Sequence, residues 1–452
     1  MPSSSCPEKQ SSVSDPQQYD EQFVTWFRAV TPYINAFRGK TFIVAFGGKA
    51  IASGFAKTLA YDINLLASLG IRLVLVHGAR PQIDEELEEK GLKPRYHKGY
   101  RITDAQTLDC VLDAVGSVYL EIAALLSQGL PNTPMANARI RVIGGNFVTG
   151  QPIGVLDGVD LQYAGKVRKV DAEGLRAQLG LGNIVLLNCE GSSPTGEIFN
   201  LQMEEVAEAV AIALKADKLV YLTDSHGVTR KNGELLDALT ADEVADIAWM
   251  GDWLSPDLKR YLPCAIRASR HGVGRVHLIG YETDGALLQE LFTHDGVGTV
   301  ITRESLENIR EARPDDIGSL IALIEPMEEE GILVHRPREL LEREIDHFSV
   351  MEHDGIMVGC AALYCHSETD GELACLAVHP DHREWGYGEQ LLKRIEKRAK
   401  AAGIKRLFVL TTRTEHWFVE RGFRLAGVDE LPEEKRQMYN YQRRSKVLFK
   451  PL

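Results

Sequence analysis

Residues 372–392, ELACLAVHPDHREWGYGEQLL, decide the fold of the second half of the chain. The apolar run 373–378 is typical of a buried strand, and Pro380 ends it because proline has no N–H for a sheet ladder. Residues 391–395, LLKRI, begin an apolar pattern of helical spacing. A glycine-containing turn therefore joins a predicted strand to a predicted helix.

The turn itself, Arg383-x-x-Gly386-x-Gly388, predicts an anion site. Backbone N–H groups are unpaired at the start of a helix, and the helix dipole attracts negative charge there. Glycine has no Cβ to block a close approach to a pyrophosphate. The motif is neither GxGxxG nor GxxxxGK[ST], the dinucleotide and P-loop patterns. We predict a diphosphate cradle, with an ordinary strand–turn–helix connection as the alternative.

The segments around this turn predict the order β-α-α-β-β-β-α-β-α-β, beginning with a strand at 309–312 and ending with one at 422–428. An R-x-x-G-x-G loop after V-x-P, with Gly422-Phe423 following Trp417-Phe418, resembles the GCN5-related N-acetyltransferases. The resemblance covers 305–452 and implies acetyl-coenzyme A as the co-substrate.

Composition excludes several classes of protein. The 452 residues suggest two or three domains, and the net charge of −13 disfavours nonspecific binding to nucleic acid. No apolar run reaches 18 residues, so we expect no membrane span, and the polar N-terminus is not a secretory signal. The seven cysteines form no CxxC pair and no zinc-type spacing, which predicts reduced thiols, no metal and a cytoplasmic location.

The N-terminal region combines a polar tail with an apolar helix. We predict that residues 1–19 are disordered. Residues 21–37 carry apolar side chains at spacings of three and four, which predicts an amphipathic helix that Pro32 kinks or divides into two short helices. Its apolar face needs a partner surface, either on the same chain or on another subunit.

Strands alternate with helices from residue 41 to residue 224, which predicts a parallel sheet with helices on both faces. Two glycine turns, at 46–49 and 77–80, follow strands at the edge where ligands bind in such sheets. FGGKAI, VHGARPQID, ADKLVYLTD, VHLIG and ELFTHDGVGT resemble the amino-acid kinase family, with acetylglutamate kinase as the nearest branch.

The two resemblances together imply an α/β chain in which an amino-acid kinase-like parallel-sheet sandwich precedes an N-acetyltransferase α/β domain. The expected domains are a tail at 1–19, a kinase-like regulatory domain at 20–303 and a catalytic acetyltransferase domain at 304–452.

The kinase-like domain departs from its family where phosphoryl transfer needs positive charge. Ala45 stands at the position of the first kinase lysine, and Tyr261 at that of the second, although Lys259 is close. Arg80 replaces a glycine of the second turn. The carboxylate that organises the kinase site is replaced in this chain, near Glu204. Because phosphoryl transfer depends on positioned charge, we predict that this domain lacks kinase activity.

A regulatory role would explain why the domain persists. In arginine-sensitive acetylglutamate kinases, a pocket near this domain's C-terminal end and the N-terminal helix binds arginine. The matching residues that the resemblance assigns to an arginine effector are Lys218, His277, Glu290, Gly296 and Tyr33. Glu290 would pair with the guanidinium. The alternative is that Glu290 is a solvated helix residue and His277 a satisfied strand histidine.

The pairing of these two domains resembles the bacterial-type N-acetylglutamate synthase family, through GILVHRPRE, GELACLAVHP, HWF-x-ERGF and RRSKVL. That resemblance implies acetyl transfer from acetyl-coenzyme A to the amine of L-glutamate, the first step of arginine biosynthesis. It further implies feedback regulation by L-arginine and a homo-oligomer, a hexamer assembled partly through the N-terminal helix.

Acetyl transfer to an amine needs a polarised thioester and a neutral amine. Glu372 lies on the predicted strand beside the thioester, so it is the candidate base, and we expect burial to raise its pKa. The alternative is an ion-paired structural glutamate. Leu376 would polarise the carbonyl through its backbone N–H.

The resemblance assigns further residues to the site. Thr411 would assist the leaving thiol. The coenzyme would contact Leu376, Ala377, Val378, Arg383, Gly386, Tyr387, Gly388 and Phe418. The substrate would contact Arg336, Cys375, Leu410, Arg443 and Ser445. Two arginines suit a substrate with two carboxylates, whereas Cys375 has no histidine partner in sequence and is interpreted as a packing residue rather than a nucleophile.

Three other functions remain as alternatives. A bifunctional synthase and kinase is opposed by Ala45 and Tyr261. A non-enzymatic arginine sensor is opposed by the intact glycine loop and Glu372. An acetyltransferase for another amine, such as a protein lysine, is opposed by the arginine pair. The basic segment 435–446, KRQMYNYQRRSK, suggests nucleic acid, but substrate and coenzyme contacts explain it better in an acidic protein.

Overall fold

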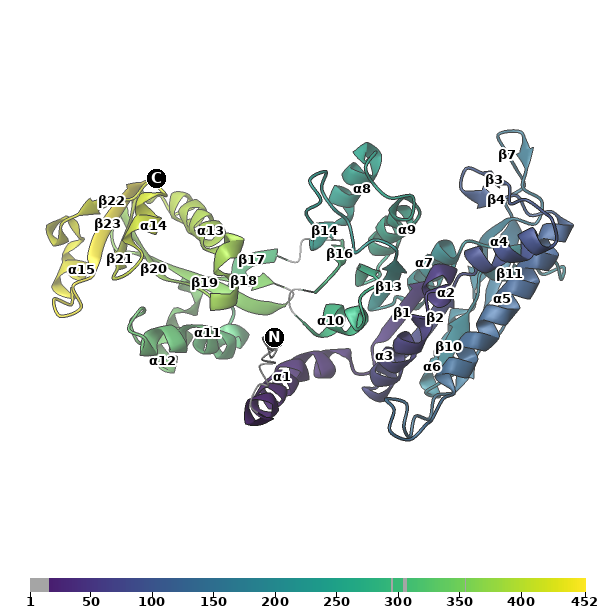
Figure 1. Cartoon of the computed structure of the whole chain (residues 1–452). Coiled ribbons are helices and arrows are strands. Elements are labelled where there is room, and N and C mark those ends of the chain that lie inside the picture. Colours follow the sequence, from purple (N-terminus) through teal and green to yellow (C-terminus); the bar gives the residue numbers. More distant parts are fainter. Residues whose placement is uncertain (1–15, 294–295, 304–306, 354) are drawn as a thin grey trace, which may run out of the picture. The chain divides into compact units, whose positions relative to one another are not determined.

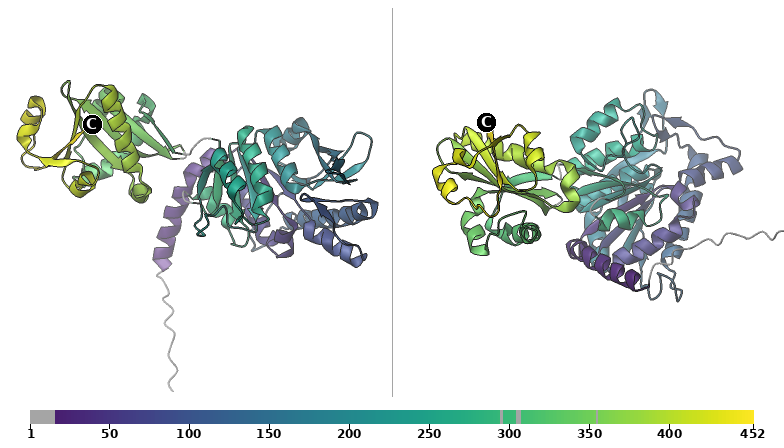
Figure 2. Two further views of the ribbon diagram at one scale, coloured as in Figure 1. Left: turned by 90° about the horizontal axis from the view of Figure 1, so that it is seen from above. Right: turned by 60° about the vertical axis from the view of Figure 1, so that its left-hand side comes forward.

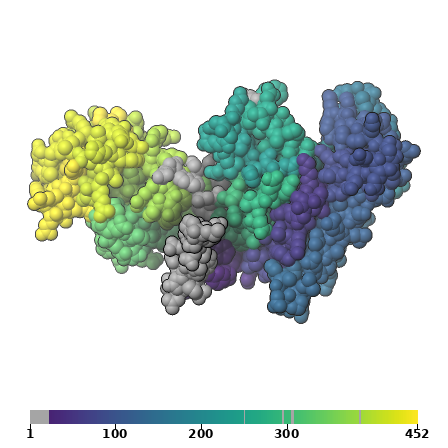
Figure 3. Space-filling model, in the orientation of Figure 1, coloured from purple at the N-terminus to yellow at the C-terminus, as the bar shows by residue number. Residues whose placement is uncertain are grey.

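Two units make up the chain in the computed structural model, residues 1–304 and residues 305–452 (Figure 1). The structure describes residues 16–293, 296–303, 307–353 and 355–452. The C-terminal unit runs from green to yellow in the space-filling view (Figure 3). Among the described residues, no helix combines the length and the apolar character needed to cross a bilayer.

An eight-stranded sheet forms the centre of the N-terminal unit. β1 pairs in parallel with β2 on one side and β13 on the other, and both faces of these central strands are buried. Among the described residues of this sheet, only β15 and β16 pair in antiparallel fashion. In spatial order the strands are β14 (Ala238–Thr240), β16 (Thr299–Thr302), β15 (Arg275–Gly280), β13 (Lys218–Thr223), β1 (Thr41–Phe46), β2 (Arg72–His77), β10 (Ile184–Leu187) and β5 (Val142–Ile143).

Two sets of helices pack on this sheet, as its buried faces require (Figure 2). Helices α2 to α5 contact one another, and so do α6 to α9, while α10 packs on β15. Their bounds are α2 (Gly48–Ala52), α3 (Ala56–Ser68), α4 (Arg80–Glu89), α5 (Ala105–Leu126), α6 (Ala172–Gly180), α7 (Met203–Leu214), α8 (Ala241–Met250), α9 (Leu258–Arg270) and α10 (Ala286–Phe292). The short helix α2 follows β1 directly and precedes α3.

Smaller strands lie beside the main sheet. A four-stranded sheet has the order β12-β11-β6-β9, and two short hairpins accompany it. The sheet comprises β6 (Val148–Pro152), β9 (Gly165–Val170), β11 (Glu190–Ser192) and β12 (Ile198–Asn200), and the hairpins β3 (Tyr96–His97) with β4 (Tyr100–Arg101) and β7 (Val155–Leu156) with β8 (Val159–Asp160).

The N-terminal helix α1 spans Pro16–Phe37 with Pro32 inside it, so it is one helix rather than two short ones. It begins within the tail predicted at 1–19, of which residues 1–15 lie outside the described part of the chain. Phe37 packs against Phe42 and Phe292 at ring distances of 5.3 and 5.6 Å. Near the other end, Phe23, Trp26 and Phe27 are each more than half exposed.

A seven-stranded sheet forms the C-terminal unit. Its spatial order is β17 (Glu307–Glu311), β18 (Phe348–His353), β19 (Ile356–Cys365), β20 (Asp370–Val378), β21 (Arg406–Thr411), β23 (Lys446–Pro451) and β22 (Arg424–Ala426). The helices are α11 (Ile317–Glu329), α12 (Arg338–Glu344), α13 (Tyr387–Ala401), α14 (Glu415–Val419) and α15 (Glu433–Gln437). The predicted order of elements agrees with the structure as far as β22. Helix α15 and strand β23 were not predicted, and β23 lies between β21 and β22 in the sheet.

Candidate functional site

Strands β20 and β21 pair in parallel over only three positions, Asp370, Gly371 and Glu372 of β20. Among the described residues, no pairing joins the two strands beyond Glu372, although β20 continues to Val378 and β21 to Thr411. Strand β21 pairs along its full length with β23 on its other side. The two strands therefore separate toward their carboxyl ends, which leaves backbone groups of residues 373–378 facing the gap.

A bulge in β20 lies within this gap. Cys360 pairs with Ala377 and Ala362 with Ala374, so Cys375 and Leu376 together oppose one residue of β19. Cys375 has a positive φ of 49°, which is unusual for a residue with a Cβ. Bulges re-aim the backbone and side chains of the strand that carries them. This bulge changes the direction of the backbone at Leu376, the residue predicted to polarise the thioester.

The predicted diphosphate cradle follows β20. Gly386 has φ +76° and precedes α13, a helix of 15 residues whose first N–H groups have no partner within the helix. A Cβ on Gly388 would lie 3.3 Å from Trp417, so the backbone is closely approached there. Arg383 is exposed beside this turn. The side chain of Tyr387 is buried and hydrogen-bonds to His353, so only its backbone faces the cradle.

Glu372 is buried, with 7% of its side chain exposed, and its carboxylate contacts a histidine and a lysine. His366 Nε2 and Lys435 Nζ lie 2.9 and 2.8 Å from Oε2. Burial raises the pKa of this carboxyl. The hydrogen bond from His366 and the charge of Lys435 lower it by more, so the net pKa is below its ordinary value. The expectation of a raised pKa was wrong, because sequence does not reveal these two partners.

Arg336 and Arg443 are brought together from segments 107 positions apart in sequence. Burial lowers the pKa of Arg443, and the positive charge of Arg336 lowers it further, which places the two guanidinium groups near each other. Arg336 Nη1 donates to the Val334 carbonyl at 2.9 Å, and Arg443 Nη2 to the Ile332 carbonyl at 2.5 Å. Neither has an ion pair with a carboxylate in the described chain, so both can take an anionic ligand.

The remaining predicted residues lie on the neighbouring strands. Thr411 ends β21, where its hydroxyl lies 2.8 Å from that of Thr414. Leu410 packs at the edge of a small cluster beneath β21 and β23, and Ser445 precedes β23 and is buried. Phe418 is 3% exposed and packs in the core against Phe423 and against Trp417, the residue that lies over Gly388.

Cys375 is buried beside Cys360 of the adjacent strand. The hydrogen bond from the Cys360 thiol lowers the pKa of Cys375 against the effect of burial, and the charge of Arg336 adds to this. Cys360 Sγ also lies 3.4 Å from the Cys375 carbonyl. Cys375 thus lies next to Arg336, which agrees with a place in the wall of the acceptor site.

Three residues of this site were not predicted from the sequence. His366 and Tyr364 lie at the end of β19, and Tyr364 pairs directly with Glu372 across the hairpin. That hairpin register could have identified them. Lys435 comes from α15, 63 positions after Glu372, and no local pattern indicates the contact.

The predicted effector residues form one buried chain of contacts in the N-terminal unit. Lys218 Nζ lies 3.1 Å from His277 Nε2, and His277 Nδ1 lies 2.7 Å from Glu290 Oε1. Glu290 Oε2 accepts from the backbone N–H groups of Val297 and Gly298. Glu290 is therefore not a solvated helix residue.

The other two predicted effector residues, Tyr33 and Gly296, lie at the two ends of this chain of contacts. Lys218 Nζ lies 5.1 Å from the ring centroid of Phe37, next to Tyr33 on α1. Gly296 has φ +62°, and a Cβ there would lie 2.6 Å from Glu290 Oε2, so only glycine fits. Burial lowers the pKa of Lys218 to about 7 and that of His277 to about 4, whereas the His277 and backbone hydrogen bonds lower that of Glu290 to about 2 against the effect of burial.

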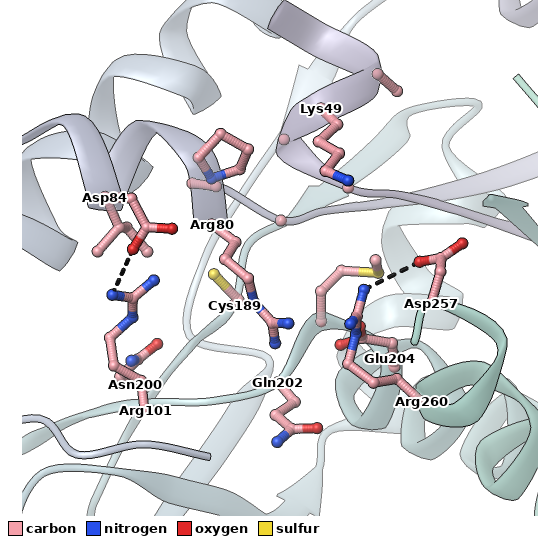
Figure 4. Close-up of a pocket in the computed structure, with 18 of the residues that line it drawn as sticks. Lys49, Arg80, Asp84, Arg101, Cys189, Asn200, Gln202, Glu204, Asp257 and Arg260 are labelled. Carbon is pink, nitrogen blue, oxygen red and sulfur yellow. Dashed lines mark hydrogen bonds and ion pairs between the residues drawn. The ribbon is translucent and has the colours of Figure 1, made fainter. Parts of the chain in front are cut away.

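The positions of the kinase lysines carry no positive charge. Ala45 is buried in β1, and Tyr261 is buried in α9 with its ring 4.9 Å from that of Tyr221. Lys259 is exposed. Glu204 pairs with Arg260 at 3.1 Å in the pocket that Figure 4 shows. In the part of the chain that the structure describes, no three His, Cys, Asp or Glu side chains are arranged to hold a metal ion.

Comparison with known families gives one match in each unit. Residues 40–280 match the amino acid kinase family, and residues 344–425 match the acetyltransferase (GNAT) domain. Among solved structures, N-acetylglutamate synthase from Neisseria gonorrhoeae with coenzyme A and L-arginine is 43% identical, with a TM-score of 0.88 over 95% of this chain and 99% of that one. The same enzyme with coenzyme A and N-acetyl-glutamate is 44% identical, with a TM-score of 0.62 over the same shares.

Curated relatives agree along almost the whole length. An amino-acid acetyltransferase from Ralstonia nicotianae is 51% identical over 438 residues, which is 97% of each chain. One from Azotobacter vinelandii is 52% identical over 432 residues, covering 95% of this chain and 99% of the relative. The predicted fold class is confirmed, and the chain is an acyltransferase that belongs to the amino-acid acetyltransferase family.

Proposed function

We propose that the C-terminal unit transfers an acetyl group from acetyl-coenzyme A to the α-amine of L-glutamate. The observation that carries this proposal is the gap between β20 and β21: their ladder ends at Glu372, and the turn at Gly386 follows β20 in the chain. Arg336 is close enough to Glu372 and Cys375 to feel their charge, and Arg443 is close to Arg336. The structure of the Neisseria gonorrhoeae enzyme with coenzyme A and N-acetyl-glutamate, the two products of this reaction, supports the proposal.

The residues present fit acetyl-coenzyme A. The turn at Gly386 and Gly388 and the start of α13 offer backbone donors for a diphosphate, with Arg383 exposed beside them. The unpaired edge of β20 at Leu376, Ala377 and Val378 offers N–H and C=O groups for the rest of the molecule. The co-substrate supplies an acetyl thioester, and the N–H of Leu376 would polarise its carbonyl.

Glu372 accepts the proton that the acceptor amine must lose before it can attack. Its lowered pKa means that the carboxylate is ionised at neutral pH, so it is always available as an acceptor. The proton reaches Glu372 directly or through one water, because a buried carboxylate borders the gap. Thr411, at the end of β21, would hydrogen-bond the leaving sulfur.

Arg336 and Arg443 select a substrate with two carboxylates. Each guanidinium forms a planar fork that matches a carboxylate, and a lysine side chain of a protein offers no carboxylate to either. Ser445, Cys375 and Leu410 complete the walls of this acceptor site. Bringing two like charges together without a carboxylate between them is unfavourable, so a dianionic ligand would be stabilised here.

We infer that the N-terminal unit binds L-arginine as an effector and does not phosphorylate. Ala45 and Tyr261 occupy the positions of the kinase lysines, and the buried chain of Lys218, His277 and Glu290 supplies groups for a guanidinium and a carboxylate. The solved relative named with L-arginine supports this ligand. Effector binding and acetyl transfer would then be coupled by a free energy that acts in both directions.

We also infer that the protein works as a homo-oligomer in the cytoplasm. The exposed apolar side chains of α1, Phe23, Trp26 and Phe27, would be covered by a second copy, and a hexamer is the expected state. The six cysteines that the structure describes are all unpaired, which fits a reducing compartment.

One assay tests the proposed reaction. Thiol release from acetyl-coenzyme A would be measured with a panel of amino acids, with and without L-arginine. L-Glutamate should be the preferred acceptor, and arginine should change the rate. A better acceptor with one carboxylate or none, or a purely hydrolytic release of thiol, would contradict the proposal.

A further inference from the structure

One loop of the C-terminal unit, residues 331–337, anchors both arginines of the proposed acceptor site; we call it the Arg336 loop. It follows α11 and carries Arg336, whose Nη1 donates to the carbonyl of Val334 in the same loop. Arg443 comes from a distant part of the sequence, and its Nη2 donates to the carbonyl of Ile332. The conformation of the Arg336 loop therefore decides where both guanidinium groups lie.

The start of the Arg336 loop is fixed by backbone hydrogen bonds. The N–H groups of Ile332 and Leu333 both donate to the carbonyl of Met327, at 2.8 and 3.1 Å. Among the described residues, the next N–H along the loop that has a hydrogen bond is that of Arg336. Its acceptor is a side-chain oxygen, Glu328 Oε1, at 3.0 Å. The backbone at Arg336 is thus held by one carboxylate rather than by a sheet or a helix.

Glu328 is buried, with 7% of its side chain exposed, and each of its oxygens has a partner on this loop. Oε1 accepts from the N–H of Arg336, and Oε2 lies 2.8 Å from Nδ1 of His335, whose side chain is 79% exposed. Cys375, in the wall of the acceptor site, lies close by: the Cys360 thiol lowers its pKa most, and the charge of Glu328 opposes this effect. The carboxylate therefore joins α11 to two consecutive loop residues beside the acceptor site.

Stability alone does not explain a carboxylate at this place. Glu328 lies in the last turn of α11, where the helix dipole disfavours negative charge. Burying a carboxylate also costs free energy unless its oxygens are hydrogen-bonded. One of its partners is a histidine that solvent reaches, and such an exposed contact contributes little to stability. The effect that remains is that the charge holds the backbone at Arg336.

We propose, on the basis of the acetyl transfer to L-glutamate proposed above, that Glu328 is a positioning residue of the acceptor site. It fixes the backbone at Arg336 and thereby aims this guanidinium at one of the two carboxylates of the acceptor. Bidentate pairing of a guanidinium with a carboxylate depends on the orientation of both planar groups. A loop that is free to turn at Arg336 loses the pairing with that one carboxylate, while Arg443 still pairs with the other.

Thiol release from acetyl-coenzyme A tests this role with three acceptors: L-glutamate, L-glutamine and L-isoglutamine. Each of the two amides lacks one of the two carboxylates. In Glu328→Ala, the preference in kcat/KM for glutamate over one of the amides should fall by roughly 10- to 100-fold, the range for a lost hydrogen bond to a charged group. The preference over the other amide should hold. KM for glutamate should rise while kcat changes little.

A second variant and a control complete the test. Glu328→Gln keeps the shape of the side chain and an oxygen for the N–H of Arg336, so it should lower the same preference by a smaller factor, since a neutral acceptor forms a weaker hydrogen bond. Glu329→Ala is the matched control, because Glu329 is exposed and adjacent on α11, and its preferences should match those of the unaltered protein.

The outcomes separate the positioning role from the reaction itself. Preferences that are unchanged in both Glu328 variants, or one common fall in kcat/KM for all three acceptors, would overturn the positioning role and leave the proposed reaction standing. An unaltered protein that releases no thiol with glutamate would overturn the proposed reaction, and the positioning role with it. A selective fall in Glu328→Ala, smaller in Glu328→Gln and absent in Glu329→Ala, supports both.

Discussion

Replacing Lys435 by methionine should shift the pH dependence of acetyl transfer. Lys435 Nζ lies 2.8 Å from Glu372 Oε2, and 23% of the lysine side chain is exposed. Burial raises the pKa of Glu372, while His366 and Lys435 lower it to a net value below 4.5. Without the lysine, burial is opposed by His366 alone. The pKa of Glu372 in Lys435→Met should therefore rise.

The size of this rise follows from the charge pair. Two unit charges about 4 Å apart interact by about 4 kcal/mol at an effective dielectric constant of about 20. That energy corresponds to a pKa change of about 3, since one unit is about 1.4 kcal/mol. Water reaches the partly exposed lysine and screens the pair, so we expect a rise of about 1 to 2 units. A base with the higher pKa is protonated, and thus inactive, at a less acidic pH.

The assay is the ratio of kcat/KM for L-glutamate in Lys435→Met and the unaltered enzyme, measured by thiol release from pH 5 to pH 9. The amine's own titration affects both proteins equally and cancels in the ratio. The ratio should fall several-fold between pH 7 and pH 5 and be level above pH 7. Arg436→Met is the control, because Arg436 lies on the same helix, α15, and is exposed. A ratio that does not change with pH would refute the assignment of Glu372 as the base.

Three further predictions concern single residues. Glu372→Gln keeps the shape of the side chain and should lower kcat by roughly 10²- to 10⁴-fold, with little change in coenzyme affinity by titration calorimetry; an unchanged kcat would remove the base. Arg443→Ala should raise KM for glutamate at least tenfold while leaving coenzyme affinity unaltered, because it removes one carboxylate contact; equal loss of both affinities would argue for a folding defect. Glu290→Ala should leave acetylation intact, weaken the response to arginine in the thiol-release assay and lower the free energy of unfolding by about 1–3 kcal/mol, since it leaves the N–H groups of Val297 and Gly298 unpaired; an unaltered arginine response would show that the effector binds elsewhere.

Local patterns were enough to predict the elements whose causes are local. The strand at 373–378, the turn at Gly386 and the helix after it depend on apolar spacing, on proline and on glycine, and all three can be identified within about 20 residues. The loss of the kinase lysines could also be predicted, because Ala45 and Tyr261 are uncharged whatever surrounds them. A resemblance to known families then joined these pieces into two domains.

Tertiary structure decided what each buried charge does. The low pKa of Glu372 depends on Lys435, which arrives from a short helix 63 positions away, and burial alone predicted the opposite sign. Strand β23 lies between β21 and β22 although it follows both in sequence, so the local alternation of residues could not place it. Sequence determines which groups the chain carries, but their charges depend on distance and burial, which only the folded chain sets.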